Sequence, residues 1–209
     1  ISTGLNCIYY GSPEYEPSAR FIEGDERKFA WTEGDRENEA LPIQLEGDYN
    51  LDNITTAIAV GLYFDVNKEL IGQAISNYTP SNNRSQTTTT GRNTVLLDAY
   101  NANPSSMTGA LQSFAKNIEG DKLVILGDMR ELGEYSHEAH KEIVGLCEKL
   151  GLDALYVGEA FYAVTDGGAK YFPTTDDLKR VLEVEVVKGK TVLLKGSRGM
   201  RMEQLLPLL

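Results

Sequence analysis

The sequence predicts an α/β protein whose larger part is a doubly wound, mainly parallel, Rossmann-like sheet, preceded by a smaller, partial α+β unit. From Asn93 onward, short apolar runs alternate with amphipathic stretches, which is typical of parallel strands joined by helices. Before that point, short β-like runs are followed by two helical stretches. The pattern changes at residues 79–83, a polar stretch that contains a proline, as is common at boundaries. We therefore predict one unit over residues 1–80 and a second over residues 81–209.

The first unit is expected to contain four short β-like runs and two helices. The runs lie at residues 7–10, 20–22, 28–31 and 43–45, and acidic turns that contain glycine separate them. The helices are expected over residues 53–63 and 68–77.

The second unit is expected to contain five strands and three amphipathic helices. The strands are predicted at residues 94–97, 123–126, 154–157, 170–172 and 191–194. The helical faces are Met107, Ala110, Leu111 and Phe114; then Ala139, Ile143, Leu146, Cys147 and Leu150; then Met202, Leu205, Leu206 and Leu209. Spacings of three and four residues place each set on one side of a helix. Asn103 followed by Pro104 predicts the start of the first helix. Ser136 with Glu138 predicts the start of the second.

The composition is that of an ordinary folded protein. Of 209 residues, 41% are hydrophobic and 24% are charged, and 31 acidic residues against 20 basic ones give a formal net charge of −11. This composition argues against disorder, and no apolar run approaches the ~20 residues that a membrane-spanning helix needs. The negative charge argues against DNA or RNA as a partner, because Lys and Arg contacts supply most of that affinity. Small anions remain possible ligands, since a few placed donors can hold them.

The two cysteines and the first residues indicate the cellular setting. Cys7 and Cys147 are expected to be buried thiols of a protein in a reducing cytoplasm. Residues 1–6 contain neither an initiator Met nor a signal-peptide pattern. We therefore expect the chain to be a piece of a longer protein.

Polar side chains follow the first strand of the predicted parallel sheet. In such a sheet the ligand crevice lies beyond the carboxyl ends of the strands. Asp98, Asn101 and Asn103 come directly after residues 94–97. A carboxylate can accept hydrogen bonds from a diol such as ribose, and amides both donate and accept. The alternative is that these residues form turns and cap the next helix.

A second set of polar residues follows the last strand. Lys195, Gly196, Ser197 and Arg198 lead into the helix that holds Met202. Helix amides, a hydroxyl and a guanidinium suit a phosphate or a carboxylate. The alternative is a capped surface helix whose cations are solvated. We expect the segments with Asp98 and Ser197 to share one edge of the sheet and to face Arg84. The long charged loop at residues 127–133 either covers a site or is solvated.

Several catalytic motifs are absent from the sequence. Residues 189–191, Gly-Lys-Thr, resemble the end of a phosphate-binding loop, but Val184 occupies the earlier glycine position, and the tripeptide leads into a strand. No Gly-x-Gly-x-x-Gly follows a strand, and no Gly-x-Ser-x-Gly is present. His137 and His140 flank Glu138 without zincin spacing and are predicted to be helix residues. We expect no metal site and no catalytic residue in this chain.

Three motifs identify the chain as similar to the Mur ligase family. They are residues 98–107 (DAYNANPSSM), residues 126–133 (LGDMRELG), and residues 195–198 (KGSR) with Met202 and Glu203. In this order, each after a strand, they resemble the carboxyl-terminal domain of the family's enzymes that add D-alanyl-D-alanine. Residues 47–53 (GDYNLDN) resemble the end of the family's central ATPase domain, and the likeness is weak before about Gln44. The resemblance identifies residues 1–80 as a remnant of that domain and residues 81–209 as the carboxyl-terminal domain.

The resemblance implies an ATP-dependent amide ligation in peptidoglycan precursor synthesis in the cytoplasm. The carboxylate of UDP-N-acetylmuramoyl-tripeptide attacks the γ-phosphate of ATP, and the amine of D-alanyl-D-alanine captures the resulting acyl phosphate. ATP and Mg²⁺ are the implied cofactors. We expect the protein to be a monomer. The family's phosphate-binding loop and magnesium ligands match nothing in this sequence, and they belong to an upstream part of the central domain. The chain alone is therefore expected to be inactive and to bind ATP weakly.

The resemblance also implies roles for individual residues. Asn53 corresponds to an asparagine that contacts adenine, Arg84 to a hinge arginine that reaches the nucleotide, and Asp98 to an aspartate that binds ribose hydroxyls. The expected surface for the dipeptide or the nucleotide-sugar peptide consists of Asn101, Asn103, Ser197 and Arg198. Two positions depart from the family pattern, because Tyr49 replaces a histidine and Leu97 an acidic residue.

Two other functions are compatible with this fold class, because one architecture hosts many functions. One is a nonenzymatic module that binds a small ligand or regulates a partner. The other is a ligase of the folylpolyglutamate type, whose motifs fit residues 100–104 and 127–133 less well. Arg84 together with the polar loops after the first and last strands favours the ligase, since a plain binding module does not require that combination.

Overall fold

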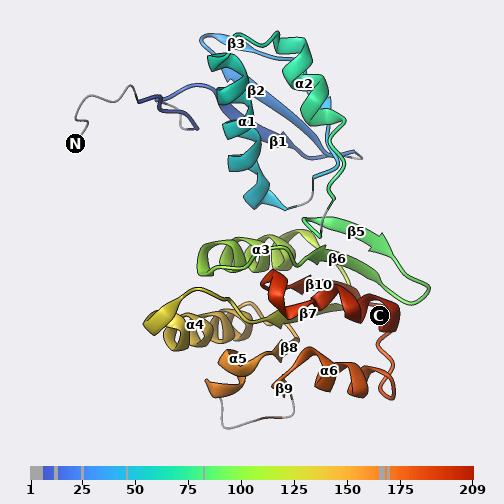
Figure 1. Ribbon diagram of the computed structural model, residues 1–209. Coiled ribbons are helices and arrows are strands. Elements are labelled where there is room, and N and C mark those ends of the chain that lie inside the picture. The colour runs from blue at the N-terminus through green and yellow to red at the C-terminus, as the bar shows by residue number, and fades with distance from the viewer. Residues whose placement is uncertain are drawn as a thin grey trace. The chain divides into compact units, whose positions relative to one another are not determined.

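The computed structural model describes residues 7–11, 14–24, 26–45, 47–81, 83–164, 168 and 170–209. Residues 1–6, expected to carry no signal pattern, and Asn82 of the polar stretch lie outside the described residues. The chain divides into two compact units, Ile1–Thr79 and Pro80–Leu209, whose elements are labelled in Figure 1. No helix in the described part of the chain has both the length and the apolar character needed to span a bilayer.

The first unit is an antiparallel sheet covered by two helices. The sheet consists of β1 (Ser18–Ile22), β2 (Lys28–Glu33), β3 (Arg36–Glu37) and β4 (Leu41–Pro42). The strands β1, β3 and β4 each pair antiparallel with β2. A 3-10 turn, η1 (Asp48–Asn50), precedes α1 (Leu51–Tyr63), and α2 (Lys68–Ser76) follows. The core contains Ala19, Phe29, Trp31 and Ile43 of the β-rich part and Ile54, Ile58, Ile71 and Ile75 of the helices. Both predicted helices and the strands near residues 20–22 and 28–31 are therefore confirmed.

Two predicted strands of the first unit are wrong. Residues 7–10 form no strand, and Ile8 and Tyr9 expose about half or more of their surface (52% and 62%). The Tyr9 ring contacts the Tyr15 ring. The strand expected at residues 43–45 lies instead at β4, Leu41–Pro42. Ile43 of the predicted run is buried in the core and Leu45 packs, partly buried, against it, so alternating burial without strand pairing produced the β-like pattern.

The second unit is a six-stranded sheet in the order β5-β6-β10-β7-β8-β9 (Figure 1). Its strands are β5 (Gln86–Thr89), β6 (Thr94–Asp98), β7 (Lys122–Gly127), β8 (Ala154–Val157), β9 (Tyr171–Phe172) and β10 (Thr191–Lys195). All neighbours are parallel except β5 and β6. The doubly wound, mainly parallel sheet is confirmed. The polar edge strand β5 was not predicted, because its sequence, Gln-Thr-Thr-Thr, lacks the apolar side chains that mark a buried strand.

Helices cover both faces of this sheet. They are α3 (Pro104–Asn117), α4 (Ser136–Lys149), α5 (Glu159–Ala163) and α6 (Thr175–Leu182), with 3-10 segments η2 (Gly133–Tyr135), η3 (Arg198–Met200) and η4 (Met202–Leu208). Right-handed crossovers place α3, α4 and α5 on one face, because β6, β7, β8 and β9 follow one direction across the sheet. The chain then reverses to β10, so α6 lies on the other face.

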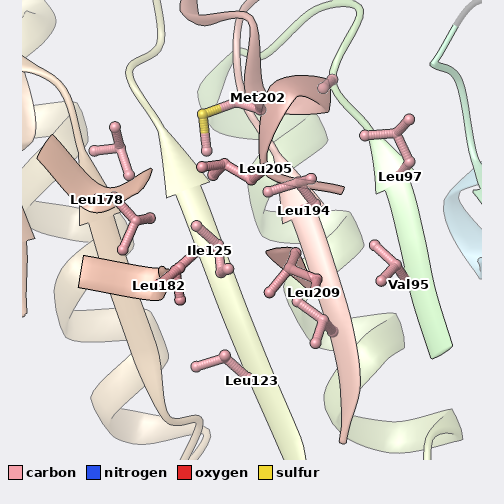
Figure 2. Close-up of a cluster of buried hydrophobic side chains, with 13 residues drawn as sticks. Val95, Leu97, Leu123, Ile125, Leu178, Leu182, Leu194, Met202, Leu205 and Leu209 are labelled. Carbon is pink, nitrogen blue, oxygen red and sulfur yellow. The ribbon is translucent and has the colours of Figure 1, made fainter. Parts of the chain in front are cut away.

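The face covered by α6 and η4 is closed by a hydrophobic cluster (Figure 2). Alternate residues of the central strands, among them Val95, Ile125 and Leu194, belong to this cluster together with Leu178 of α6 and Leu205 of η4. These five side chains are fully buried. Because successive strand residues point to opposite faces, the intervening residues point toward the face that α3 and α4 cover.

The last helix is correctly located but has a different form from the one predicted. Residues 202–209 were expected to form an α-helix, whereas η4 is a 3-10 helix. Pro207 lies inside it and has no N–H to donate, and the Leu209 N–H bonds to the Leu206 carbonyl three residues back. Met202, Leu205 and Leu209 still face the core.

The two cysteines differ in exposure. Cys147 on α4 is buried, as predicted, but Cys7 is exposed, so its predicted burial is wrong. The reason is that residues 7–10 form no strand to bury it. Burial raises the pKa of the Cys147 thiol to about 11.

We expect only Cys7 to react with a thiol reagent such as dithionitrobenzoate in the folded protein near pH ~8. The thiolate is the nucleophile, and Cys147 is both inaccessible and held neutral. A time course of thionitrobenzoate release should show one rapid equivalent and a second only in denaturant. Cys7→Ser should remove the rapid phase. Two equivalents at one rate in the folded protein would contradict the burial of Cys147.

Candidate functional site

The carboxyl ends of β6 and β10 lie side by side, with Asp98 paired in register with Lys195. The Lys195 Nζ lies 2.5 Å from Asp98 Oδ2 and also donates to the Asn101 carbonyl at 3.4 Å. Lys195 is almost fully buried, with 1% of its surface exposed. The alternative interpretation of Lys195 as a solvated cation is therefore wrong. Its charge is neutralised inside the protein.

Asp98 also supports the turn that carries Arg84. Its Oδ1 accepts a hydrogen bond from the Ser85 N–H at 3.3 Å, and the Ala99 N–H donates to the Asn83 carbonyl at 2.8 Å. Asn83 and Ser85 adopt left-handed backbone conformations, with φ of 59° and 45°. Such conformations persist where the surroundings determine them. The end of β6 therefore fixes the backbone on both sides of Arg84.

Two arginines meet on the ring of Tyr100. The Arg84 guanidinium lies 3.9 Å from the ring centroid and the Arg198 guanidinium 5.4 Å from it. An open cleft of about 460 Å³ is lined here by Asn83, Tyr100, Arg198 and Glu203; we call it the Tyr100 cleft. The two guanidinium groups on one ring concentrate positive charge beyond β6 and β10, where phosphate or carboxylate oxygens can be bound. The cleft lining itself contains one of these cations, Arg198, and one carboxylate, Glu203.

The other polar residues predicted after these strands hold the loops in place. Asn103 caps α3, accepting from the Ser106 N–H at 2.8 Å while Ser106 Oγ accepts from the Asn103 N–H. Asn101 is exposed, and its Oδ1 accepts from the Ala102 N–H. Ser197 is buried, and its Oγ accepts from the Arg130 N–H at 2.9 Å. The segments that follow β10, η3 and η4, are 3-10 helices and not the predicted α-helix.

The charged loop after β7 borders a second cleft. The cleft has a volume of about 420 Å³ and is lined by Asp128, Arg130, Gly158, Glu159, Pro173, Thr174, Thr175, Gly199 and Met200; we call it the Arg130 cleft. Asp128 accepts hydrogen bonds from the Ala160 and Phe161 N–H groups, each at 3.0 Å. A side chain at Gly158 would overlap the Asp128 carboxylate, and one at Gly199 would overlap the Arg130 guanidinium. The cleft combines a cation, Arg130, with two carboxylates, Asp128 and Glu159, of which Asp128 is used by the N–H groups of α5.

Comparison with known proteins decides the family. Residues 83–198, more than half of the chain, match the profile described as "Mur ligase, glutamate ligase domain". The chain belongs to the Mur ligase family. The match begins at the turn that holds Arg84 and ends at Arg198, so it spans the segments that form the Tyr100 cleft except Glu203.

Individual relatives are similar to this Mur ligase chain in sequence and in fold. A UDP-N-acetylmuramoyl-tripeptide–D-alanyl-D-alanine ligase of Bacillus subtilis is 30% identical over 175 residues, covering 78% of this chain and 38% of the relative. The crystal structure I of MurF from Acinetobacter baumannii matches with 27% identity and a TM-score of 0.73, covering 87% of this chain and 41% of that one. MurF ligase from Thermotoga maritima in complex with ADP shares the fold, with a TM-score of 0.74 at 19% identity over 91% of this chain and 45% of that one. The chain spans about two fifths of the length of the curated relative.

The remaining predicted residues of the Mur ligase chain lie as follows. Asn53 is exposed on α1 of the first unit, where its amide donates to Asn50 Oδ1 at 3.0 Å. Tyr49 lies in η1, and a side chain at Gly47 would overlap its ring. Leu97 is buried in the cluster under η4, which gives this position a packing role in place of a charge.

Sequence reasoning missed two features of the site in this Mur ligase. Tyr100 stood within a quoted motif, but no local pattern indicates that its ring supports two guanidinium groups. The burial of Lys195 likewise had no local signal, because Asp98 and Lys195 end strands that become neighbours only in the folded sheet. Residues 189–191 form a turn into β10, as predicted, with Gly189 at φ 71°. In the part of the chain that the structure describes, no group of three or more acidic, His or Cys side chains could hold a metal ion.

Proposed function

We propose that this chain is the carboxyl-terminal part of an ATP-dependent ligase that adds D-alanyl-D-alanine to UDP-N-acetylmuramoyl-tripeptide through an acyl phosphate. The observation that carries the proposal is the pair of arginines on Tyr100, in a chain whose curated relative bears that name. In this proposal residues 1–80 are a remnant of the central ATP-binding domain and residues 81–209 the carboxyl-terminal domain. A nonenzymatic module is not favoured, because the named relatives are ligases.

The nucleotide is proposed to meet three of the predicted residues. Arg84 binds phosphate oxygens, with its guanidinium oriented by the Tyr100 ring. Asp98 accepts from ribose hydroxyls in addition to its internal partners, since a carboxylate offers about four lone-pair directions and two are used by Lys195 and Ser85. Asn53 contacts adenine through its exposed amide. The support for ATP is the relative from Thermotoga maritima, which was solved with ADP.

The two other substrates are proposed to use the loops after β6, β7 and β10. Asn101 and Arg198 present exposed side chains for the nucleotide-sugar peptide, while Asn103 and Ser197 keep those loops in place. D-alanyl-D-alanine carries an ammonium and a carboxylate, which suit the opposite charges of Glu159 and Arg130 in the Arg130 cleft.

Magnesium is a proposed cofactor of the whole enzyme and not of the described residues. No group of side chains among them fits a metal ion, so we assign its ligands to the upstream part of the central domain. We further propose that the protein is cytoplasmic, because nucleotide-sugar precursors and ATP are cytoplasmic substrates, and that it is a monomer.

The isolated chain is expected to form no product from the tripeptide, D-alanyl-D-alanine and ATP. Joining it to the upstream part of the Bacillus subtilis relative, which is expected to supply the phosphate-binding loop, should restore ATP-dependent ligation. Release of inorganic phosphate with formation of the pentapeptide product measures both. In the joined protein, Arg84→Ala should lower kcat by about 10²–10³-fold, the typical loss of a group that stabilises developing charge.

Arg180→Ala is the matched control for this experiment, because Arg180 lies on α6 with its side chain 76% exposed. It should leave kcat unchanged. Product formed by the isolated chain would overturn the proposed dependence on the central domain. A joined protein that folds but forms no product would overturn the proposed reaction.

A further inference from the structure

A buried histidine lies beneath the loop that forms the Arg130 cleft. His140 on α4 has no exposed surface, and the predicted role as a plain helix residue does not account for its contacts. Its Nε2 accepts a hydrogen bond from the Met129 N–H at 3.0 Å, and its Nδ1 lies 2.6 Å from the Ser136 carbonyl. A carbonyl only accepts, so Nδ1 carries the proton and Nε2 has the lone pair. This neutral tautomer satisfies both contacts.

The surroundings keep the imidazole in this orientation. Its ring meets the Phe161 ring edge to face, with centroids 4.5 Å apart and an interplanar angle of 83°. The Asp128 Oδ1 lies 3.7 Å from Nε2, and this carboxylate already accepts from two N–H groups of α5. The imidazole therefore fits between α5 and the loop, with Nε2 directed at the loop backbone.

Three successive residues of the loop are held by different elements. The Asp128 carboxylate binds the start of α5, the Met129 N–H binds His140 of α4, and the Arg130 N–H binds Ser197 after β10. The Ser197 N–H in turn donates to the Asp128 carbonyl at 3.1 Å. The backbone that leads into the Arg130 side chain is thus fixed from both sides.

The Arg130 guanidinium lies against Gly199, in the segment that follows Ser197. Its Nη2 lies 3.5 Å from the Gly199 carbonyl, and the guanidinium occupies the space that a side chain at Gly199 would fill. Arg130 itself is exposed at the cleft. Its position depends on the loop backbone, since no ion pair with it is found among the described residues.

We infer that His140 is a positioning residue, which holds the Met129 N–H and so fixes Arg130 to receive a carboxylate in the Arg130 cleft. The inference rests on the proposed function for the identity of the ligand, a dipeptide carboxylate. Without the Nε2 acceptor, the Met129 N–H is left buried and unpaired, which favours a different loop conformation. Arg130 then samples several positions, and the bound carboxylate loses a fixed partner.

Two substitutions separate the hydrogen bond from the volume of the ring. His140→Phe keeps an aromatic ring against Phe161 but removes the acceptor, and His140→Gln provides an amide oxygen near the place of Nε2. We expect His140→Phe to weaken binding of D-alanyl-D-alanine to the 209-residue chain by about tenfold and His140→Gln to recover most of that loss. NMR titration of ¹⁵N-labelled chain with the dipeptide at millimolar concentration measures the affinity.

A double-mutant cycle with Arg130→Ala distinguishes positioning from general damage. In the Arg130→Ala background, His140→Phe should cause no further loss of affinity. An equal loss with and without Arg130 would overturn the inference, as would an unchanged affinity in His140→Phe alone. Far-UV circular dichroism of each variant confirms that the fold is retained.

A readout without dipeptide keeps the inference separate from the proposed function. Long-range ¹H–¹⁵N spectra of the imidazole should show the proton on Nδ1, and the Met129 amide should exchange slowly in the wild type and rapidly in His140→Phe. A proton on Nε2, or a Met129 amide that stays protected in His140→Phe, would overturn the positioning role. A wild-type chain that shows these signatures but no dipeptide binding would overturn only the dipeptide assignment of the Arg130 cleft.

Discussion

Replacing Lys195 by methionine is expected to destabilise the second unit by about 3–5 kcal/mol, the typical cost of leaving one charge of a buried ion pair without its partner. The side chains of Lys195 and Asp98 are only 2% and 11% exposed, and they are 2.5 Å apart. Methionine fills a similar volume, so the loss comes from the unpaired Asp98 carboxylate. Urea unfolding followed by far-UV circular dichroism measures it. The one tryptophan, Trp31, lies in the first unit and does not follow this transition.

Two further variants show whether burial of the ion pair is the cause. Lys170→Met breaks the exposed ion pair with Asp153, whose side chains are 59% and 52% exposed, and should cost no more than about 1 kcal/mol. Asp98→Leu combined with Lys195→Met replaces both charges by apolar groups, and it should recover most of the stability lost by Lys195→Met alone. A loss of less than about 1 kcal/mol in Lys195→Met would contradict the burial of the pair.

Replacing Leu194 by alanine is expected to destabilise the second unit by about 2–5 kcal/mol. Leu194 is fully buried in the central strand β10, where it lies close to Met202 and Leu205 in the hydrophobic cluster (Figure 2). Its truncation removes apolar contacts and leaves a cavity that strands on both sides prevent from closing. The shift in the urea midpoint at constant slope measures the effect.

One control keeps the side-chain volume at the buried position, and the other truncates an exposed side chain. Leu194→Met keeps the volume and should cost less than about 1.5 kcal/mol. Val184→Ala truncates a residue that is 82% exposed and should stay within about 0.5 kcal/mol of the wild type. Similar losses for Leu194→Ala and Val184→Ala would show that the cluster under η4 does not stabilise the unit.

Local sequence patterns were sufficient for most elements of the fold. The five apolar runs after Asn93 are strands, and Asn103 with Pro104 starts α3 as predicted. The pattern failed at residues 7–10, where apolar residues are exposed, and at β5, where a polar segment pairs with β6. In both places, pairing with another segment decides the structure, and composition does not show whether a partner is present.

The candidate site was predicted less completely than the fold. The sequence placed polar residues after β6 and β10, and Arg84, Tyr100 and Arg198 do gather there. It did not show which polar groups are used inside the protein. Lys195 pairs with a residue 97 positions away, and the Ser197 hydroxyl is used by a residue 67 positions away.

By itself, the order of apolar and polar residues determined a parallel sheet with helices on both faces, because burial of strand and helix faces depends on spacing along the chain. The three motifs determined the family for the same reason, since each is a contiguous segment. Only the tertiary structure decided that Lys195 is buried, that Tyr100 supports two arginines and that His140 binds the backbone of the charged loop at residues 127–133. These outcomes depend on contacts between strands and helices that are distant in sequence, and local spacing carries no record of them.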